Sequence, residues 1–130
     1  MRESPVQAAI RLGLGRLRHT RLWRNSRGKG WIGPVVGHQS DGSILILKPQ
    51  RIEFGLVNGA SDLIGLTQIT ITADMVGKTV AVFTAIEVKP PGEEAKTHQQ
   101  HFIDFVNNFG GLAGVAHSPD EATRLVTRRG

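Results

Sequence analysis

The stretch TVAVFTAIEVK, residues 79–89, is a β-branched, apolar run that ends on a glutamate and a lysine. Valine, isoleucine, threonine and phenylalanine are enriched in strands, so the stretch predicts a β-strand. Side chains alternate along a strand, which places Glu87 and Lys89 on one face and Val88 on the other. Burying such a charged pair is costly unless the protein uses it. The end of this strand is therefore a candidate functional site.

A second strand is expected over residues 63–72, which are rich in isoleucine and threonine. A turn is expected at residues 75–78, so the two strands are predicted to form a hairpin. Asp62, at the start of the first strand, would then lie roughly opposite Glu87. Two carboxylates that converge at one end of a sheet form an oxygen-ligand site suited to Mg²⁺ or Mn²⁺.

The flanking sequence predicts further elements. Ser4 and Pro5 are a cap and a first-turn proline, so a helix begins there and ends early because of Gly13 and Gly15. Residues 20–33 are rich in arginine and glycine and favour a loop or an irregular edge. Short strands are expected over 44–47 and 51–56, a helix over 97–109, a strand over 112–116 and a helix over 118–127. This order is typical of a single α/β domain around a mixed sheet.

The charge of the chain is uneven. The formal net charge is +5, and residues 1–40 hold eight basic residues against Glu3 alone. A basic end suits a polyanionic partner whose phosphates supply salt-dependent affinity, although a solvated basic face is the alternative. The chain has no cysteine, which excludes disulfides and thiolate chemistry and is compatible with a cytoplasmic protein. No segment is long and apolar enough to predict a membrane span.

The Asp62, Glu87 and Lys89 set fits phosphodiester hydrolysis. The two carboxylates would hold the metal, and the backbone carbonyl of Val88 would add a ligand. A bound metal lowers the pKa of its water and neutralises charge that develops on the phosphate. Lys89 would orient or deprotonate that water, or stabilise the transition state.

The ordered motifs resemble one nuclease family. GASDLIG at residues 59–65, IEVK at 86–89, Gln100 with Phe102, and Gly110-Gly111 are similar to the VRR-NUC (virus-type replication-repair) branch of the PD-(D/E)XK nucleases. Glu3 with Gln7, and Arg24-Asn25 ahead of Gly28, are similar to small phage and prophage members. Ser61 stands where the proline of the motif name would be.

This resemblance implies a restriction-endonuclease-like central mixed β-sheet flanked by helices, formed by residues 1–130 as one domain. Asp62, Glu87 and Lys89 would be the catalytic core, Gln100 would face the site from the following helix, and Glu3 would be an additional carboxylate near the metal. Gln99 competes with Gln100, and the spacing to Phe102 favours Gln100.

Basic and polar residues of the 21–29 segment are candidate DNA contacts through phosphates. They are Arg21, Arg24, Asn25, Arg27 and Lys29. Trp23 lies among them as a stacking residue, or as core or dimer packing.

Plainer interpretations remain for the site residues. Glu87 and Lys89 are also compatible with an exposed cross-strand pair, and Asp62 with a turn residue after Asn58-Gly59. Glu3 in a first helical turn would already be favoured by the helix dipole. Gln100 would then only hydrogen-bond the end of the sheet.

The main hypothesis is a Mg²⁺- or Mn²⁺-dependent DNA endonuclease that acts on branched or duplex DNA. The resemblance implies a junction-resolvase-like homodimer, encoded by a phage or prophage and working in replication, recombination or repair in the bacterial cytoplasm. The alternatives are a non-catalytic DNA-binding module with a vestigial site, and, more remotely, a small RNA-binding structural protein.

Overall fold

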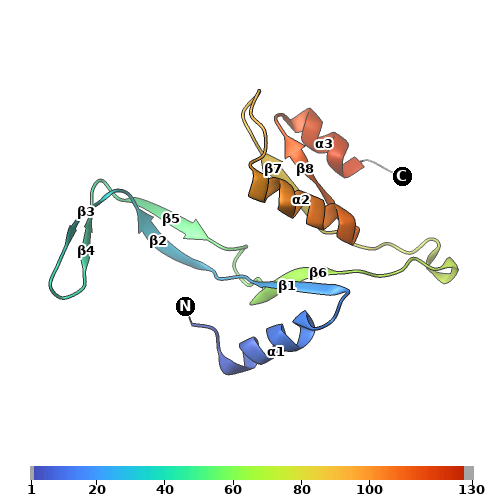
Figure 1. The fold of residues 1–130 in the computed structure, drawn as a ribbon, viewed down its shortest axis with the longest axis horizontal. Helices are drawn as coiled ribbons and strands as arrows, with labels where there is room; N and C mark the ends of the chain where they lie inside the picture. The colour runs from blue at the N-terminus through green and yellow to red at the C-terminus, as the bar shows by residue number, and fades with distance from the viewer. Residues whose placement is uncertain (1, 128–130) are drawn as a thin grey trace. The chain divides into compact units, whose positions relative to one another are not determined.

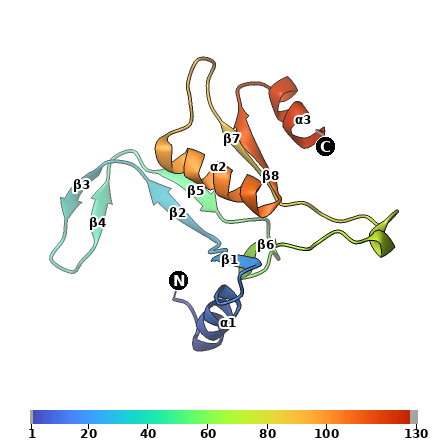
Figure 2. The same ribbon diagram turned by 45° about the vertical axis from the view of Figure 1, so that its right-hand side comes forward.

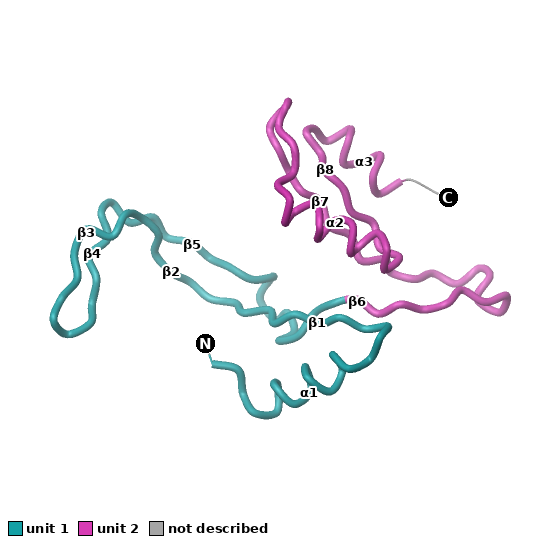
Figure 3. The backbone as a smooth tube through the Cα atoms, viewed as in Figure 1, with its two compact units in different colours: residues 1–65 teal, residues 66–130 magenta. Residues whose placement is uncertain are grey.

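The structure is a computed structural model that describes residues 2–127. It divides into two compact units, residues 1–65 and residues 66–130 (Figure 3). The elements of the described chain are α1 (Pro5–Gly15), β1 (Thr20–Arg24), β2 (Gly28–Ile32), β3 (Val35–His38), β4 (Ile44–Ile46), β5 (Gln50–Phe54), β6 (Leu63–Thr67), the 3₁₀ turn η1 (Ala73–Met75), β7 (Thr84–Val88), α2 (Thr97–Phe109), β8 (Leu112–Ala116) and α3 (Pro119–Thr127) (Figure 1).

Helix α1 begins as its sequence predicts. The Ser4 side chain accepts a hydrogen bond from the backbone N–H of Gln7 at 3.1 Å, and Pro5 occupies the first helical position. A side-chain cap of this kind satisfies one of the N–H groups that a helix start leaves without a partner. The helix ends at Gly15, in line with the early end that the glycines predicted.

The strands of the first unit form nested pairs. Strand β3 pairs antiparallel with β4, and this pair lies in sequence between β2 and β5, which also pair antiparallel, with Gly28 opposite Phe54 and Ile32 opposite Gln50. Strand β1 pairs with β6. The expected loop over residues 20–33 is therefore wrong, because both β1 and β2 lie within it. Its arginines and glycines are compatible with strands here because each strand finds a distant partner.

The second unit packs helices onto a parallel pair of strands. β7 and β8 run parallel with Glu87 opposite Val115, and α2 lies along them in both views (Figures 1 and 2). Four apolar residues are buried between the start of α2 and the end of α3. They are Ile103 and Val106 of α2 and Ala113 and Ala116 of β8, and Val106 is fully enclosed. Helix α2 ends at Phe109, and Gly110 caps it in the left-handed conformation, φ 103°, as the glycine pair predicted.

Asn107 joins the end of α2 to the outer side of β8. Its Nδ2 donates to the carbonyl oxygen of Ala113 at 3.0 Å, and its Oδ1 accepts from the N–H of Ala113 at 2.9 Å. The side-chain amide thus supplies both hydrogen bonds that a neighbouring strand would make with this residue.

The expected hairpin between residues 63–72 and 79–89 is wrong in the part of the chain that the structure describes. β6 spans only Leu63–Thr67 and pairs with β1, while β7 spans only Thr84–Val88 and pairs with β8. The turn between them is present as η1, with Gly77 at φ 84°. The strand propensity of the residues around the turn does not by itself select a partner.

The fold class is α/β, as expected, with three helices and both antiparallel and parallel strand pairs in the described residues. Residues 2–127 carry these strands as four two-stranded sheets.

Candidate functional site

Asp62 lies in the first unit at the entrance to β6. A turn at residues 57–60 precedes it, in which Gly59 has φ 88°. The carbonyl oxygen of Asp62 accepts a hydrogen bond from the N–H of Asn25 at 2.8 Å, and its side chain is exposed. A small cavity of about 90 Å³ adjoins it, lined by Arg2, Gln7, Arg24, Asn25, Ser26 and Asp62. Asp62 therefore lines a small pocket together with two arginines, Arg2 and Arg24.

Glu3 lies close to two arginines, one of which, Arg24, also lines that cavity. Arg11 binds it through both carboxylate oxygens, Nε to Oε1 at 2.7 Å and Nη2 to Oε2 at 3.0 Å, and Arg24 Nε lies 4.0 Å from Oε1. The hydrogen bonds from Arg11 hold the pKa of Glu3 below its usual range. Glu3 precedes the Ser4 cap, so it is not an acidic residue of the first helical turn. That explanation of Glu3 is therefore wrong, and its carboxylate belongs to an ionic cluster.

Glu87 and Lys89 lie together at the end of β7 in the second unit. Lys89 Nζ is 3.9 Å from Glu87 Oε1, which confirms that the two side chains share a face. The Lys89 side chain is only 12% exposed and that of Glu87 31%. An exposed cross-strand pair does not fit these values, because neither group is freely solvated. The pair is partly enclosed and has a defined geometry.

Gln99, in the first turn of α2, is the glutamine that reaches Glu87. Its Nε2 donates to Glu87 Oε1 at 2.8 Å, and its Oε1 accepts from the N–H of Lys96 at 2.8 Å. Gln100 Nε2 donates instead to Asp104 Oδ1 at 2.8 Å. The preference for Gln100 over Gln99 as the side chain that faces Glu87 was therefore wrong.

Two of the candidate DNA contacts, Arg27 and Asn25, are hydrogen-bonded to the neighbouring 56–61 segment. Arg27 Nε donates to the carbonyl oxygen of Leu56 at 3.0 Å, and both ends of the Asn25 side-chain amide are hydrogen-bonded to backbone. Lys29 Nζ lies 3.7 Å from Glu53 across the β2–β5 pair, with both side chains more than half exposed, which makes this a weak pair. Arg21 lies exposed on β1.

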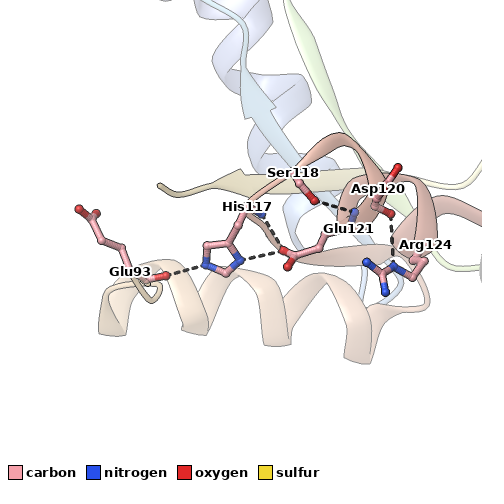
Figure 4. A network of polar contacts seen from close by, with 6 residues as sticks. All are labelled: Glu93, His117, Ser118, Asp120, Glu121 and Arg124. Atoms are coloured by element: carbon pink, nitrogen blue, oxygen red, sulfur yellow. Dashed lines mark hydrogen bonds and ion pairs between the residues drawn. The ribbon is translucent and has the colours of Figure 1, made fainter. Parts of the chain in front are cut away.

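A polar network around His117 was missed from the sequence. His117 Nδ1 contacts Glu121 Oε2 at 2.8 Å and Nε2 contacts the carbonyl oxygen of Glu93 at 2.7 Å (Figure 4). Since both partners are acceptors, the Glu93 carbonyl and then the Glu121 carboxylate raise the pKa of His117. The four-residue spacing of His117 and Glu121 was the available signal. The network fastens the loop between β7 and α2 to the start of α3.

Comparison with known proteins shows the family to which the chain belongs. A family model described as the VRR-NUC domain matches residues 23–120. The chain belongs to the VRR-NUC family. The matched region of this VRR-NUC protein includes Asp62, Glu87, Lys89 and both glutamines, and leaves Glu3 outside. No curated protein and no solved structure gives a significant match.

The VRR-NUC domain gives the protein a nuclease-type function, that of a hydrolase with DNA as its substrate. Nucleases of this type use divalent metals, and the donors fit such an ion in kind, because carboxylate and carbonyl oxygens suit Mg²⁺ and Mn²⁺. Gln99 and Lys89 both approach Glu87 through Oε1. In residues 2–127 no three acidic or histidine side chains form a ready metal cluster, and no helix of that range is long and apolar enough to cross a membrane.

Proposed function

We propose that this VRR-NUC protein is a Mg²⁺- or Mn²⁺-dependent DNA endonuclease with Asp62, Glu87 and Lys89 as its catalytic residues. The observation that carries the proposal is the Glu87–Lys89 pair, partly enclosed and oriented by Gln99, within the region that the family model matches. If Glu87 and Lys89 served only solubility, Gln99 would not be needed to hold the Oε1 atom of Glu87.

Asp62, Glu87 and the carbonyl of Val88 would hold the metal, which when bound lowers the pKa of a water molecule and neutralises charge on the phosphate. Lys89 contributes a cation at the same strand end. Its Nζ orients the attacking water or donates to a non-bridging phosphate oxygen as negative charge develops there. Gln99 keeps the Glu87 carboxylate in one orientation. Glu3 is a further carboxylate of the proposed site. To bind the metal, it would have to release one of the two carboxylate oxygens that Arg11 now binds.

DNA would be held by the basic residues of the first unit. Arg21, Arg24, Arg27 and Lys29 supply phosphate contacts, which position the backbone without reading its sequence. The net charge of +5 supports a salt-dependent affinity.

One site of this kind cuts one strand. We therefore propose a homodimer that makes paired incisions in branched DNA, as a junction resolvase does. Its setting would be phage or prophage replication, recombination or repair in the cytoplasm of a bacterial host. The two compact units would together form one nuclease domain, which the single family match across both supports.

A cleavage assay tests this proposal. Labelled four-way junction, flap, single-stranded and duplex DNA are each incubated with Mg²⁺, Mn²⁺ or EDTA. The protein is compared with Glu87→Gln and with Glu94→Gln, which changes an exposed glutamate of the same unit. We expect metal-dependent cutting by the wild type and by Glu94→Gln, none by Glu87→Gln, and DNA binding by all three.

The preferred substrate would decide between a resolvase and a general endonuclease. Cleavage retained by Glu87→Gln would refute the proposed site. Tight, salt-dependent DNA binding by the wild type without cutting of any substrate would instead establish the non-catalytic DNA-binding module.

A further inference from the structure

Asn25 holds the segment that leads into Asp62 with three hydrogen bonds. Its N–H donates to the carbonyl oxygen of Asp62 at 2.8 Å, and its Nδ2 donates to the carbonyl oxygen of Ser61 at 3.1 Å. Its Oδ1 accepts from the N–H of Leu56 at 3.1 Å. One residue therefore binds both ends of the 56–62 segment.

Arg27 and Gly55 also hold the 56–62 segment close to residues 25–27. Arg27 Nε donates to the carbonyl oxygen of Leu56 at 3.0 Å, and Arg27 Nη1 lies 3.4 Å from Asn58 Oδ1. Gly55 has φ 87°, and a Cβ there would meet the carbonyl oxygen of Ser26 at 2.7 Å and the Cα of Arg27 at 2.8 Å. Only glycine permits both this backbone conformation and this approach. The 56–62 segment is thus fastened to residues 25–27 along most of its length.

These contacts leave little of Asn25 for DNA. Its side chain is half-buried. The side-chain oxygen Oδ1 accepts a hydrogen bond from Leu56, and one of the two hydrogens on Nδ2 is donated to Ser61. Asn25 directs its side-chain amide at the backbone on either side of the turn at residues 57–60.

We propose that Asn25 is a positioning residue for Asp62: it fixes the backbone from which the Asp62 carboxylate reaches the metal, and it is not a DNA contact. This inference rests on the function proposed above, in which Asp62 is a metal ligand. Groups that orient a metal ligand typically contribute about 10- to 100-fold to metal affinity when they are removed. Losing the side-chain bonds of Asn25 to Leu56 and Ser61 should therefore weaken metal binding while leaving the affinity for DNA unchanged.

The test uses Asn25→Ala, with Asn108→Ala on the exposed side of α2 as the matched control. Calorimetry measures Mn²⁺ binding to the full chain without DNA, and fluorescence anisotropy measures binding of a labelled DNA duplex in EDTA. We expect the Mn²⁺ dissociation constant of Asn25→Ala to rise about 10- to 100-fold, with DNA binding within twofold of the wild type. Asn108→Ala should match the wild type in both measurements.

Asn25→Asp keeps the acceptor for the N–H of Leu56 but loses the donor to the carbonyl oxygen of Ser61. If Asn25→Ala does not fold, the same two measurements on Asn25→Asp test the inference. Weaker DNA binding at unchanged Mn²⁺ affinity would show that Asn25 is a DNA contact and would overturn the inference. Unchanged values in both measurements would overturn it as well. A wild type that binds no Mn²⁺ would refute the proposed metal site itself, whereas a wild type that binds Mn²⁺ beside an unaltered Asn25→Ala would refute only the role of Asn25.

Discussion

Gln99 and Gln100 are adjacent, and the structure gives them different roles. Gln99 holds Glu87 Oε1 at 2.8 Å, whereas Gln100 is bonded to Asp104 on the same helix. Gln99→Met and Gln100→Met are therefore a matched pair of substitutions that keep the approximate size of the side chain and remove its amide. We expect only the first to reduce cleavage strongly.

The magnitude follows from the bond that is lost. A hydrogen bond to a charged group contributes about 1.5–3 kcal/mol. The Glu87 side chain is 31% exposed, so water partly replaces the lost donor and the lower end of that range applies. About 1.4 kcal/mol corresponds to a factor of ten, and we expect Gln99→Met to lower the cleavage rate about tenfold. Gln100→Met should stay within about twofold, because its bond is an exposed contact within one helix.

Single-turnover cleavage of the preferred DNA at saturating metal measures this effect. Thermal unfolding runs beside it, because Gln99 also accepts from the N–H of Lys96 and its loss costs about 1 kcal/mol of helix capping. That cost lowers the melting temperature without changing the rate per folded molecule. If Gln100→Met reduced cleavage as much as Gln99→Met or more, the assignment of Gln99 to Glu87 would be refuted.

Three further predictions concern the fold. Val106→Ala removes two methyl groups from a fully buried side chain and should lower the free energy of unfolding by about 2 kcal/mol, seen as a lower urea midpoint at unchanged slope. Gly65→Ala would place a methyl group on the backbone carbonyl of Arg21, so circular dichroism should show loss of the β1–β6 pairing, and native-like stability would contradict this. The pKa of His117 is raised in the folded state, so its contribution is complete below the unfolded value of about 6.5 and is lost as pH rises through the folded value. The stability difference between the wild type and His117→Ala should accordingly shrink from pH 5.5 to pH 8.5, and a constant difference would contradict a charged His117.

Local signals in the sequence were sufficient for the helices. Ser4-Pro5 and Ser118-Pro119 mark two helix starts and Gly110 marks a helix end, and all three lie at these places in the structure. Each signal acts through hydrogen bonds within a few residues. No distant partner is needed, so a short window of sequence contains the information.

Strand pairing was not predictable in the same way. Residues 63–72 and 79–89 have strong β-propensity, but their paired parts join β1 and β8 rather than each other. Pairing depends on partners far along the chain, and propensity measures only how well a side chain suits a pleated surface. The arginine-rich segment over residues 20–33 was misjudged for the same reason.

Within the candidate site, one feature was predictable from the sequence and another was not. The period of two along a strand correctly placed Glu87 beside Lys89. The spacing to Phe102 is a poor guide to the phase of the helix, because Phe102 is 41% exposed. The buried stripe of α2 runs through Ile103 and Val106, and Gln99 lies four and seven residues before them on that stripe. Whether Asp62 and Glu87 share one metal, as the family resemblance implies, remains a prediction for the Mn²⁺ and cleavage measurements.

The amide of Asn107 has a consequence for how the molecule meets other molecules of its kind. An unpaired strand edge is a template on which a foreign chain can add a strand, and such addition leads to aggregation. At Ala113 both backbone groups on the outer side of β8 are already occupied by Asn107. A strand arriving from another molecule would have to displace this side chain before it could form its first bonds there. A single asparagine at the end of a helix thus protects part of the strand edge against self-association.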